Sequence, residues 1–234
     1  MNFILLQLNV VGDSVQQVAN VAATAQDGLS FWTMAVKGGW IMLVILLFSI
    51  MAGYIFFERF FVIRRALKLD NHFMDTIKNQ IKEGKVEEAL SYCDSYDHPL
   101  SRMIKKGILR IGKPMEDVNV AIENVGKLEV AKLEKGLTTL ATSAGAAPMI
   151  GFLGTVMGMI RSFYDMASVE GGNISVSLLS NGIYTAMVTT VGGLIVGILA
   201  YLAYNYLVAR VENVVNQLEA STMDFMDLLN APAE

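Results

Sequence analysis

Small residues and threonines at helical spacing are the side chains that could do chemistry in the two long uncharged stretches of residues 136–160 and 171–209. They recur every three or four positions, which places each set on one face of a helix. The first set is Ala144, Ala147, Gly151, Gly154, Thr155, Gly158 and the nearby Ser162; the second is Gly182, Ala186, Thr190, Gly193, Gly197 and Ala200. Glycines on such faces let helix backbones approach closely, and threonine hydroxyls there can donate and accept hydrogen bonds.

Close packing alone is the simpler explanation for these residues. Gly154-x-x-x-Gly158 and Gly193-x-x-x-Gly197 are ordinary helix-contact motifs, and membrane threonines often bond back to their own helix. Two small-residue faces are nevertheless more than a three-helix monomer needs, which predicts self-association around a further helix. Neither stretch contains Asp, Glu, Lys, Arg or His, so this chain supplies no titratable proton carrier there.

Other reactive residue types indicate no site. His72 and His98 have no matching ligand set, and Cys93 has no evident activating partner and is expected to be a small buried hydrophobe. No phosphate-binding loop is present, and a net charge of −4 gives no basic surface for nucleic acid. We therefore expect no metal, no cofactor and no nucleic-acid partner.

The elements that carry the small residues are predicted to be membrane helices. Of the 234 residues, 53% are hydrophobic and 17% charged, well below the roughly 25% charged of soluble proteins, which argues against a soluble enzyme. A third uncharged run covers residues 38–57, and about 20 apolar residues cross a bilayer. The sequence therefore predicts an all-α membrane protein with three transmembrane helices.

The basic residues predict the orientation. Fourteen of the 18 Lys and Arg residues lie between Arg64 and Lys135, so this segment is expected in the cytoplasm, with the N-terminus outside. Within it, Phe73, Ile77 and Ile81 favour a helix that ends at Gly84. Further helices are expected over residues 86–93, 100–111 and 115–135. The last should continue unbroken into the second span, with its mixed charges on a solvated face.

The N-terminal residues favour a short amphipathic helix, capped at Asp13 or Ser14, along the outer membrane boundary. A cleaved signal peptide is the alternative, since residues 3–11 are apolar and Ala23-Thr24-Ala25 is similar to a cleavage site.

Two motifs resemble a known family. The run Ala147-Pro148-Met149-Ile150-Gly151-Phe152-Leu153-Gly154-Thr155-Val156-Met157-Gly158 is similar to the second-span signature of the MotA/TolQ/ExbB proton-channel family. Gly182, Ile183, Ala186, Thr189, Thr190, Gly192, Gly193 and Leu194 are similar to its third-span signature. Three spans and a large cytoplasmic segment resemble the ExbB branch first and the TolQ branch second, because the MotA branch has four spans.

The resemblance implies a homo-pentameric ring in a bacterial inner membrane. Its second and third spans would line a pore that receives a single-span ExbD- or TolR-like partner dimer with the titratable aspartate. Thr155 and Thr190 match the family's pore threonines, and Thr185 stands where ExbB proteins commonly have glutamate. Gly151, Gly154, Gly158, Gly193 and Gly197 would pack the pore helices.

The implied function is an ExbB-like stator subunit, not an enzyme, that uses proton flow to energise a TonB-like protein and transport across the outer membrane. A TolQ-like role in the envelope and cell division and a purely structural scaffold remain open, as does H⁺ against Na⁺. The expected regions are a periplasmic N-terminal segment (1–37), transmembrane helix 1 (38–58), a cytoplasmic helical segment (59–135), transmembrane helix 2 (136–162), a periplasmic loop (163–176), transmembrane helix 3 (177–209) and a cytoplasmic C-terminal helix and tail (210–234).

Overall fold

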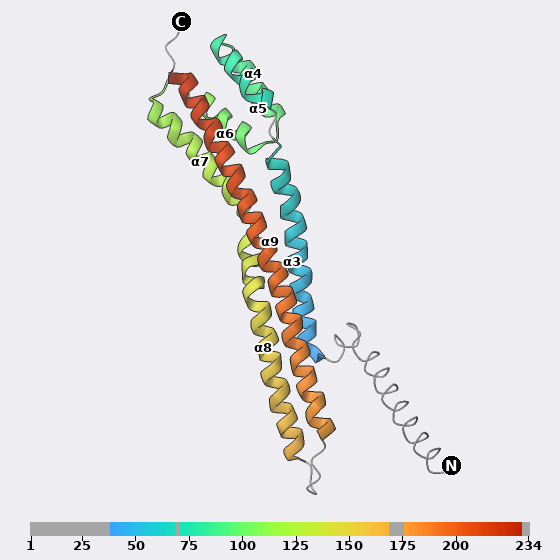
Figure 1. The fold of residues 1–234 in the computed structure, drawn as a ribbon. Helices are drawn as coiled ribbons and strands as arrows, with labels where there is room; N and C mark the ends of the chain where they lie inside the picture. The colour runs from blue at the N-terminus through green and yellow to red at the C-terminus, as the bar shows by residue number, and fades with distance from the viewer. Residues whose placement is uncertain (1–37, 69–70, 169–175, 231–234) are drawn as a thin grey trace, which may run out of the picture. The chain divides into compact units, whose positions relative to one another are not determined.

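The computed structural model describes residues 38–68, 71–168 and 176–230 (Figure 1). The regular elements of these residues are all helices: α3 (Gly39–Ala66), α4 (Asn71–Lys82), α5 (Val86–Ser95), α6 (Pro99–Ile108), α7 (Met115–Glu134), α8 (Leu137–Ala167) and α9 (Val176–Asn230). The expected N-terminal amphipathic helix and the alternative cleavage site lie outside the described residues.

Within the described residues, three helical segments are long and apolar enough to cross a membrane: Gly39–Ala66, Met115–Ala167 and Gly182–Asn230. Each contains most or all of one of the uncharged runs, because a run of about 20 residues without charges satisfies both helix length and bilayer thickness. The all-helical membrane fold with three candidate spans is confirmed.

The expected unbroken rod from residue 115 into the second span is wrong. The helix ends at Glu134, and α8 begins only at Leu137. Lys135 has extended backbone angles, and Gly136 has a φ of +86°, in the left-handed region that favours glycine. The glycine therefore ends α7 and lets the chain start a new helix in a changed direction.

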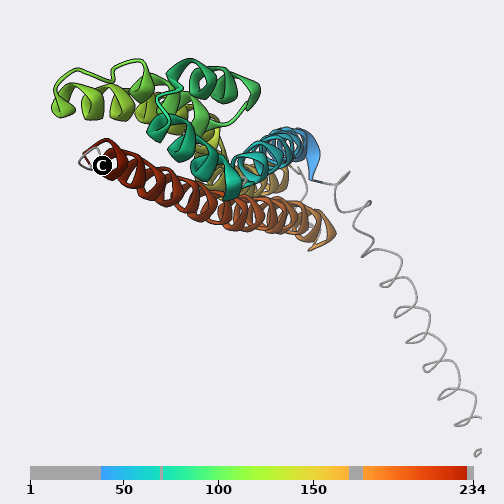
Figure 2. The same cartoon turned by 90° about the horizontal axis from the view of Figure 1, so that it is seen from above.

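The chain forms two compact units, which are described separately. The first unit comprises residues 1–49 and 145–198, and its described part contains the start of α3, most of α8 and the first part of α9. The second unit comprises residues 50–144 and 199–234, with α4 to α7 and the C-terminal part of α9. In the second unit, α4 to α7 gather on one side of this part of α9 (Figure 2).

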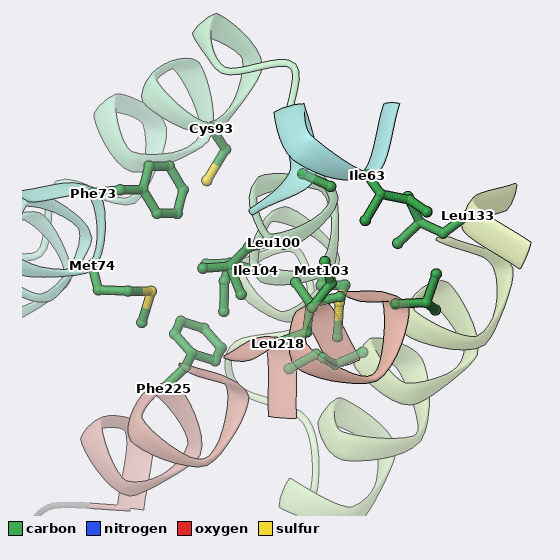
Figure 3. Close-up of a cluster of buried hydrophobic side chains, with 14 of the residues drawn as sticks. Ile63, Phe73, Met74, Cys93, Leu100, Met103, Ile104, Leu133, Leu218 and Phe225 are labelled. Carbon is green, nitrogen blue, oxygen red and sulfur yellow. The ribbon is translucent and has the colours of Figure 1, made fainter. Parts of the chain in front are cut away.

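The core of the second unit forms around α6. Its side chains Leu100, Ile104 and Ile108 recur every four residues and are at most 2% exposed, as expected for an amphipathic helix. Phe225 of α9 is fully buried in the same core, and Figure 3 shows it with Met74 of α4 and the α6 residues. Gly107 allows this approach, because a Cβ there would lie 2.7 Å from Phe225.

Polar contacts fix the helices around this core. Arg59 on α3 is buried, and its Nη1 donates to the Lys132 carbonyl of α7 at 3.0 Å. Nε2 of His98 donates to the Ala66 carbonyl at 2.9 Å, while its Nδ1 accepts from the Leu100 amide at 3.2 Å. The second contact caps α6 at its N-terminus.

Glu129 corrects the expectation that all mixed charges of α7 are solvated. Its side chain is 5% exposed, and its carboxylate accepts from Arg102 and Lys132 at 2.6 Å each. Burial raises the pKa of this carboxyl, but the hydrogen bonds from both cations outweigh burial and hold the pKa below its usual value. The carboxylate thus stays ionised inside the helical unit and joins α7 to α6.

Candidate functional site

Glycines bring α8 and α9 into backbone contact in the first unit (Figure 1). A Cβ at Gly151 would lie 2.8 Å from the Thr189 carbonyl oxygen and 3.1 Å from the Gly193 Cα. A Cβ at Gly193 would in turn lie 2.9 Å from the Gly151 Cα. Since backbone atoms cannot move aside, only glycine fits at both positions.

The nearest neighbours of Gly154 and Gly158 are side-chain atoms rather than backbone atoms. A Cβ at Gly154 would lie 2.5 Å from the hydroxyl of Thr189, and one at Gly158 would lie 3.0 Å from the Ala186 Cβ. Gly197 is buried on α9. In the described part of α8 and α9, Gly151 and Gly193 thus form a direct backbone contact, and the other glycines lie around it.

Thr155 and Thr190 meet directly across this contact, and their hydroxyls are hydrogen-bonded to each other. The Thr155 hydroxyl oxygen also lies 3.0 Å from the Ala186 carbonyl oxygen, and the Thr190 hydroxyl oxygen lies 3.2 Å from the Gly151 carbonyl oxygen, so the hydroxyl that does not donate to the other threonine can donate to its carbonyl. Each threonine therefore reaches the carbonyl that lies four residues before the other threonine. This reciprocal arrangement requires both helices at their present separation.

Thr189 is a third member of this hydroxyl cluster, which we define as Thr155, Thr189 and Thr190. It is 1% exposed, and its hydroxyl reaches the Ala186 carbonyl at 2.8 Å and the Gly151 carbonyl at 3.3 Å. The sequence pattern includes it in the third-span signature but does not single it out as a pore threonine. Its spacing, three residues after Ala186 and four before Gly193, would have put it on the small-residue face.

Thr185 lies apart from the cluster. It is half-buried on α9, one turn before Thr189. In the described part of the chain, no hydrogen bond joins it to the cluster. The structure therefore brings together two of the three predicted pore threonines.

The hydroxyl cluster can exchange hydrogen bonds but holds no titratable group. Each hydroxyl has one proton, so in the Thr155–Thr190 bond one hydroxyl donates to the other, which donates in turn to its carbonyl, and each oxygen keeps a lone pair for an outside donor. Thr155 and Thr190 are half-buried, whereas Thr189 is closed off. Among the described residues, no group of three or more His, Cys, Asp and Glu could hold a metal ion.

Cys93 is a structural residue, as expected. It is 2% exposed in the core of the second unit (Figure 3), and burial raises the pKa of its thiol to about 11. A protonated thiol is a poor nucleophile and a poor metal ligand.

The fold and the hydroxyl cluster define a class of helical membrane proteins whose spans meet through glycine and threonine. The sequence pattern of the MotA/TolQ/ExbB proton channel family matches residues 95–220, more than half of the chain. The match includes α6 to α8 and the cluster residues on α9. This chain belongs to the MotA/TolQ/ExbB proton channel family.

Similar proteins carry names from two branches of the family. A putative biopolymer transport protein ExbB homolog of Methanothermobacter thermautotrophicus is 29% identical over 78% of this chain, which spans 64% of that protein's length. The Tol-Pal system protein TolQ of Pseudomonas aeruginosa is 25% identical over 87% of this chain and 94% of TolQ. The biopolymer transport protein ExbB of Neisseria meningitidis is 26% identical over 81% of this chain and 91% of ExbB. The identities to ExbB and TolQ are too similar to separate the two roles.

Proposed function

We propose that this chain is an ExbB-like stator subunit of a proton-driven motor in a bacterial inner membrane. Five copies form a ring around the membrane helices of an ExbD- or TolR-like dimer, and the assembly energises a TonB-like protein and transport across the outer membrane. The N-terminus and the loop after α8 are periplasmic, and the subunit is not an enzyme. The observation that carries the proposal is the reciprocal pairing of Thr155 and Thr190 in uncharged stretches that contain no Asp, Glu, Lys, Arg or His.

The partner must supply the group that binds the proton, because the hydroxyl cluster has none. A protonated carboxylic acid donates its hydrogen to a threonine oxygen, which is free to accept. An ionised carboxylate needs a donor, so a threonine hydroxyl must turn from its carbonyl toward the partner. The cluster therefore distinguishes the two protonation states by which way its hydroxyls point.

The cost of this switch is small enough for a working cycle. Hydrogen bonds between membrane helices average about 0.6 kcal/mol, close to RT, so each hydroxyl exchanges one acceptor for another at little cost. The backbone does not need to move, since the glycine contacts already hold α8 and α9 at the required separation. Thr155 and Thr190 are the exchanging residues because Thr189 is closed off.

Valine substitutions test the role of the hydroxyls. Thr155→Val and Thr190→Val keep the side-chain shape and should assemble normally, yet abolish proton-driven activity when the chain is expressed with its single-span partner. Thr155→Ser keeps a hydroxyl at this position and should therefore retain activity that Thr155→Val loses. Thr142→Val is the matched control, because the Thr142 hydroxyl bonds only to Thr138 of its own helix in the described structure and is exposed.

Cells that lack the native copy provide the measurement. Energy-dependent uptake across the outer membrane reports the ExbB-like role, whereas chained cells and envelope leakage report the TolQ-like role. Native mass spectrometry of the extracted complex checks that each variant still forms a pentamer with its partner. Full activity of both valine variants would leave only the scaffold function.

The TolQ-like role is the second candidate, and the TolQ relative that matches 87% of this chain favours keeping it.

A valine variant of Thr185 tests whether this threonine of α9 acts with the hydroxyl cluster. Because Thr185 lies outside the cluster, Thr185→Val should reduce activity less than Thr155→Val or Thr190→Val does.

The identity of the transported ion is tested by replacing Na⁺ with K⁺ in the uptake medium, which should leave a proton-driven activity unchanged.

A further inference from the structure

A basic cavity lies between α3 and α9 in the second unit. Its volume is about 430 Å³, and we call it the basic cavity. Its walls are formed by Phe60, Ile63, Arg64, Leu67, Lys68, Tyr206, Leu207 and Arg210. Three of these eight residues are cations and none is acidic, so the cavity suits an anion.

The three cations lack carboxylate partners in the structure. Among the described residues, no ion pair involves Arg64, Lys68 or Arg210. Arg210 is held in place by Tyr206: its Nε donates to the tyrosine hydroxyl at 3.2 Å, and its guanidinium carbon lies 5.3 Å from the ring centroid. The outer nitrogens of this guanidinium remain available for a phosphate.

Neighbouring arginines outside the basic cavity do have carboxylate partners. Arg65, the next residue after Arg64, pairs with Asp97 at 3.4 Å, and Arg59 pairs with Glu58 at 2.6 Å. Three unpaired like charges around one cavity repel each other, and a bound anion relieves this repulsion.

The position and the walls of the cavity select an amphiphile. Arg210 is the first charged residue after the uncharged stretch of residues 171–209, so it marks the end of the predicted transmembrane helix 3. Phe60 and Tyr206 stack with centroids 6.3 Å apart, as aromatic residues often do at a membrane boundary. Ile63, Leu67 and Leu207 add apolar wall that a free inorganic ion would leave unused.

We propose that the basic cavity binds the headgroup of an anionic phospholipid from the leaflet at this end of the spans. The phosphate lies between Arg64 and Arg210, Lys68 contacts its outer side, and the glycerol and first acyl carbons lie on the aromatic and aliphatic walls. Basic pockets between membrane helices commonly bind acidic headgroups. The lipid links α3 to α9, and the site is independent of the hydroxyl cluster.

Native mass spectrometry of the full-length, delipidated protein in detergent tests this site. The wild type should bind dioleoyl phosphatidylglycerol at least 10-fold more tightly than dioleoyl phosphatidylcholine, which has the same chains. Arg64→Gln and Arg210→Gln should each weaken phosphatidylglycerol binding about 5- to 10-fold. Arg65→Gln is the matched control, since it removes the same charge one residue away but outside the cavity, and should stay within 2-fold.

Two further arms keep the result unambiguous. The double variant Arg64→Lys with Arg210→Lys keeps both charges and should retain the preference for phosphatidylglycerol even if the glutamine variants fail to fold. Glycerol 3-phosphate, which has the phosphate without the chains, should not displace the lipid at equal concentration. Equal binding of the two lipids, equal weakening by Arg65→Gln, loss of the preference in a folded lysine variant, or displacement by glycerol 3-phosphate would each overturn the proposal.

Discussion

A methyl group at Gly151 should separate α8 from α9 and thereby damage the hydroxyl cluster. The added Cβ would lie 2.8 Å from the Thr189 carbonyl oxygen, and ordinary contact begins at about 3.4 Å, so the helices must part by about 0.6 Å. The bond from Thr190 to the Gly151 carbonyl is 3.2 Å long. An increase of about 0.6 Å would stretch it to about 3.8 Å, beyond hydrogen-bonding distance.

The expected energy change follows from two opposing effects. Overpacking at a rigid contact costs about 1–3 kcal/mol, while replacing glycine in a helix interior by alanine gains up to about 1 kcal/mol. Gly145 on the same helix has nothing within 4 Å of an added Cβ, so Gly145→Ala should show the gain alone. The two variants should therefore differ by about 1–3 kcal/mol, with Gly151→Ala the less stable.

Reversible unfolding in mixed micelles with increasing SDS, followed by circular dichroism, measures this difference. The assay in cells that lack the native copy, described above for the threonine variants, measures activity. Gly151→Ala should be inactive in it, and Gly145→Ala should be active. If Gly151→Ala were as stable and as active as Gly145→Ala, the backbone contact between α8 and α9 would not exist as described.

Three further predictions concern the second unit. Because burial raises the pKa of Cys93 to about 11 from 9.0, alkylation by iodoacetamide at pH 8 should be about 100-fold slower in the folded than in the unfolded protein, and equal rates would contradict this. Burial is the main cause of the lowered pKa of His98, so the unfolded chain binds more protons near pH 6 and stability should fall from about pH 7 to 5. His98→Asn keeps a cap without titration and should flatten that dependence in thermal unfolding at a series of pH values; an unchanged slope would exclude His98 as its source. Glu129→Gln should cost about 1.5–3 kcal/mol in denaturant unfolding, since a charged hydrogen-bond acceptor is lost in the interior. Glu123→Gln, at an exposed pair, should cost less than about 1 kcal/mol, and equal costs would show that burial of Glu129 is unimportant.

The sequence was sufficient to predict most helices and the candidate spans, because hydropathy and helical periodicity are local properties of the chain. Phe73 and Ile77 predicted α4, and both are buried on it, at 1% and 0% exposure. The break at Gly136 was missed because a glycine beside a small-residue face suggests packing as readily as a helix end. Only its φ of +86° distinguishes the two.

Contacts between distant residues could not be predicted in the same way. Glu129 lies in a stretch of alternating charges, and nothing local indicates that Arg102, 27 residues earlier, encloses it. The same limit applies to the site. The small-residue pattern placed Thr155 and Thr190 on facing helices, but which carbonyl each hydroxyl reaches depends on the register between α8 and α9.

Helix packing and the hydrogen bonds of the threonine hydroxyls depend on each other in the structure. The Gly151 and Gly193 contact sets the separation of the helices, and that separation alone lets each threonine reach a carbonyl of the opposite helix. Valine at Thr155 removes the hydroxyl but keeps the separation, whereas alanine at Gly151 changes the separation but keeps every hydroxyl. If only the valine variant were inactive, the cluster would tolerate a longer distance between its helices. Loss of activity in both variants, with the valine protein still assembled and stable, would show that the hydroxyls act only at the distance that the glycines fix.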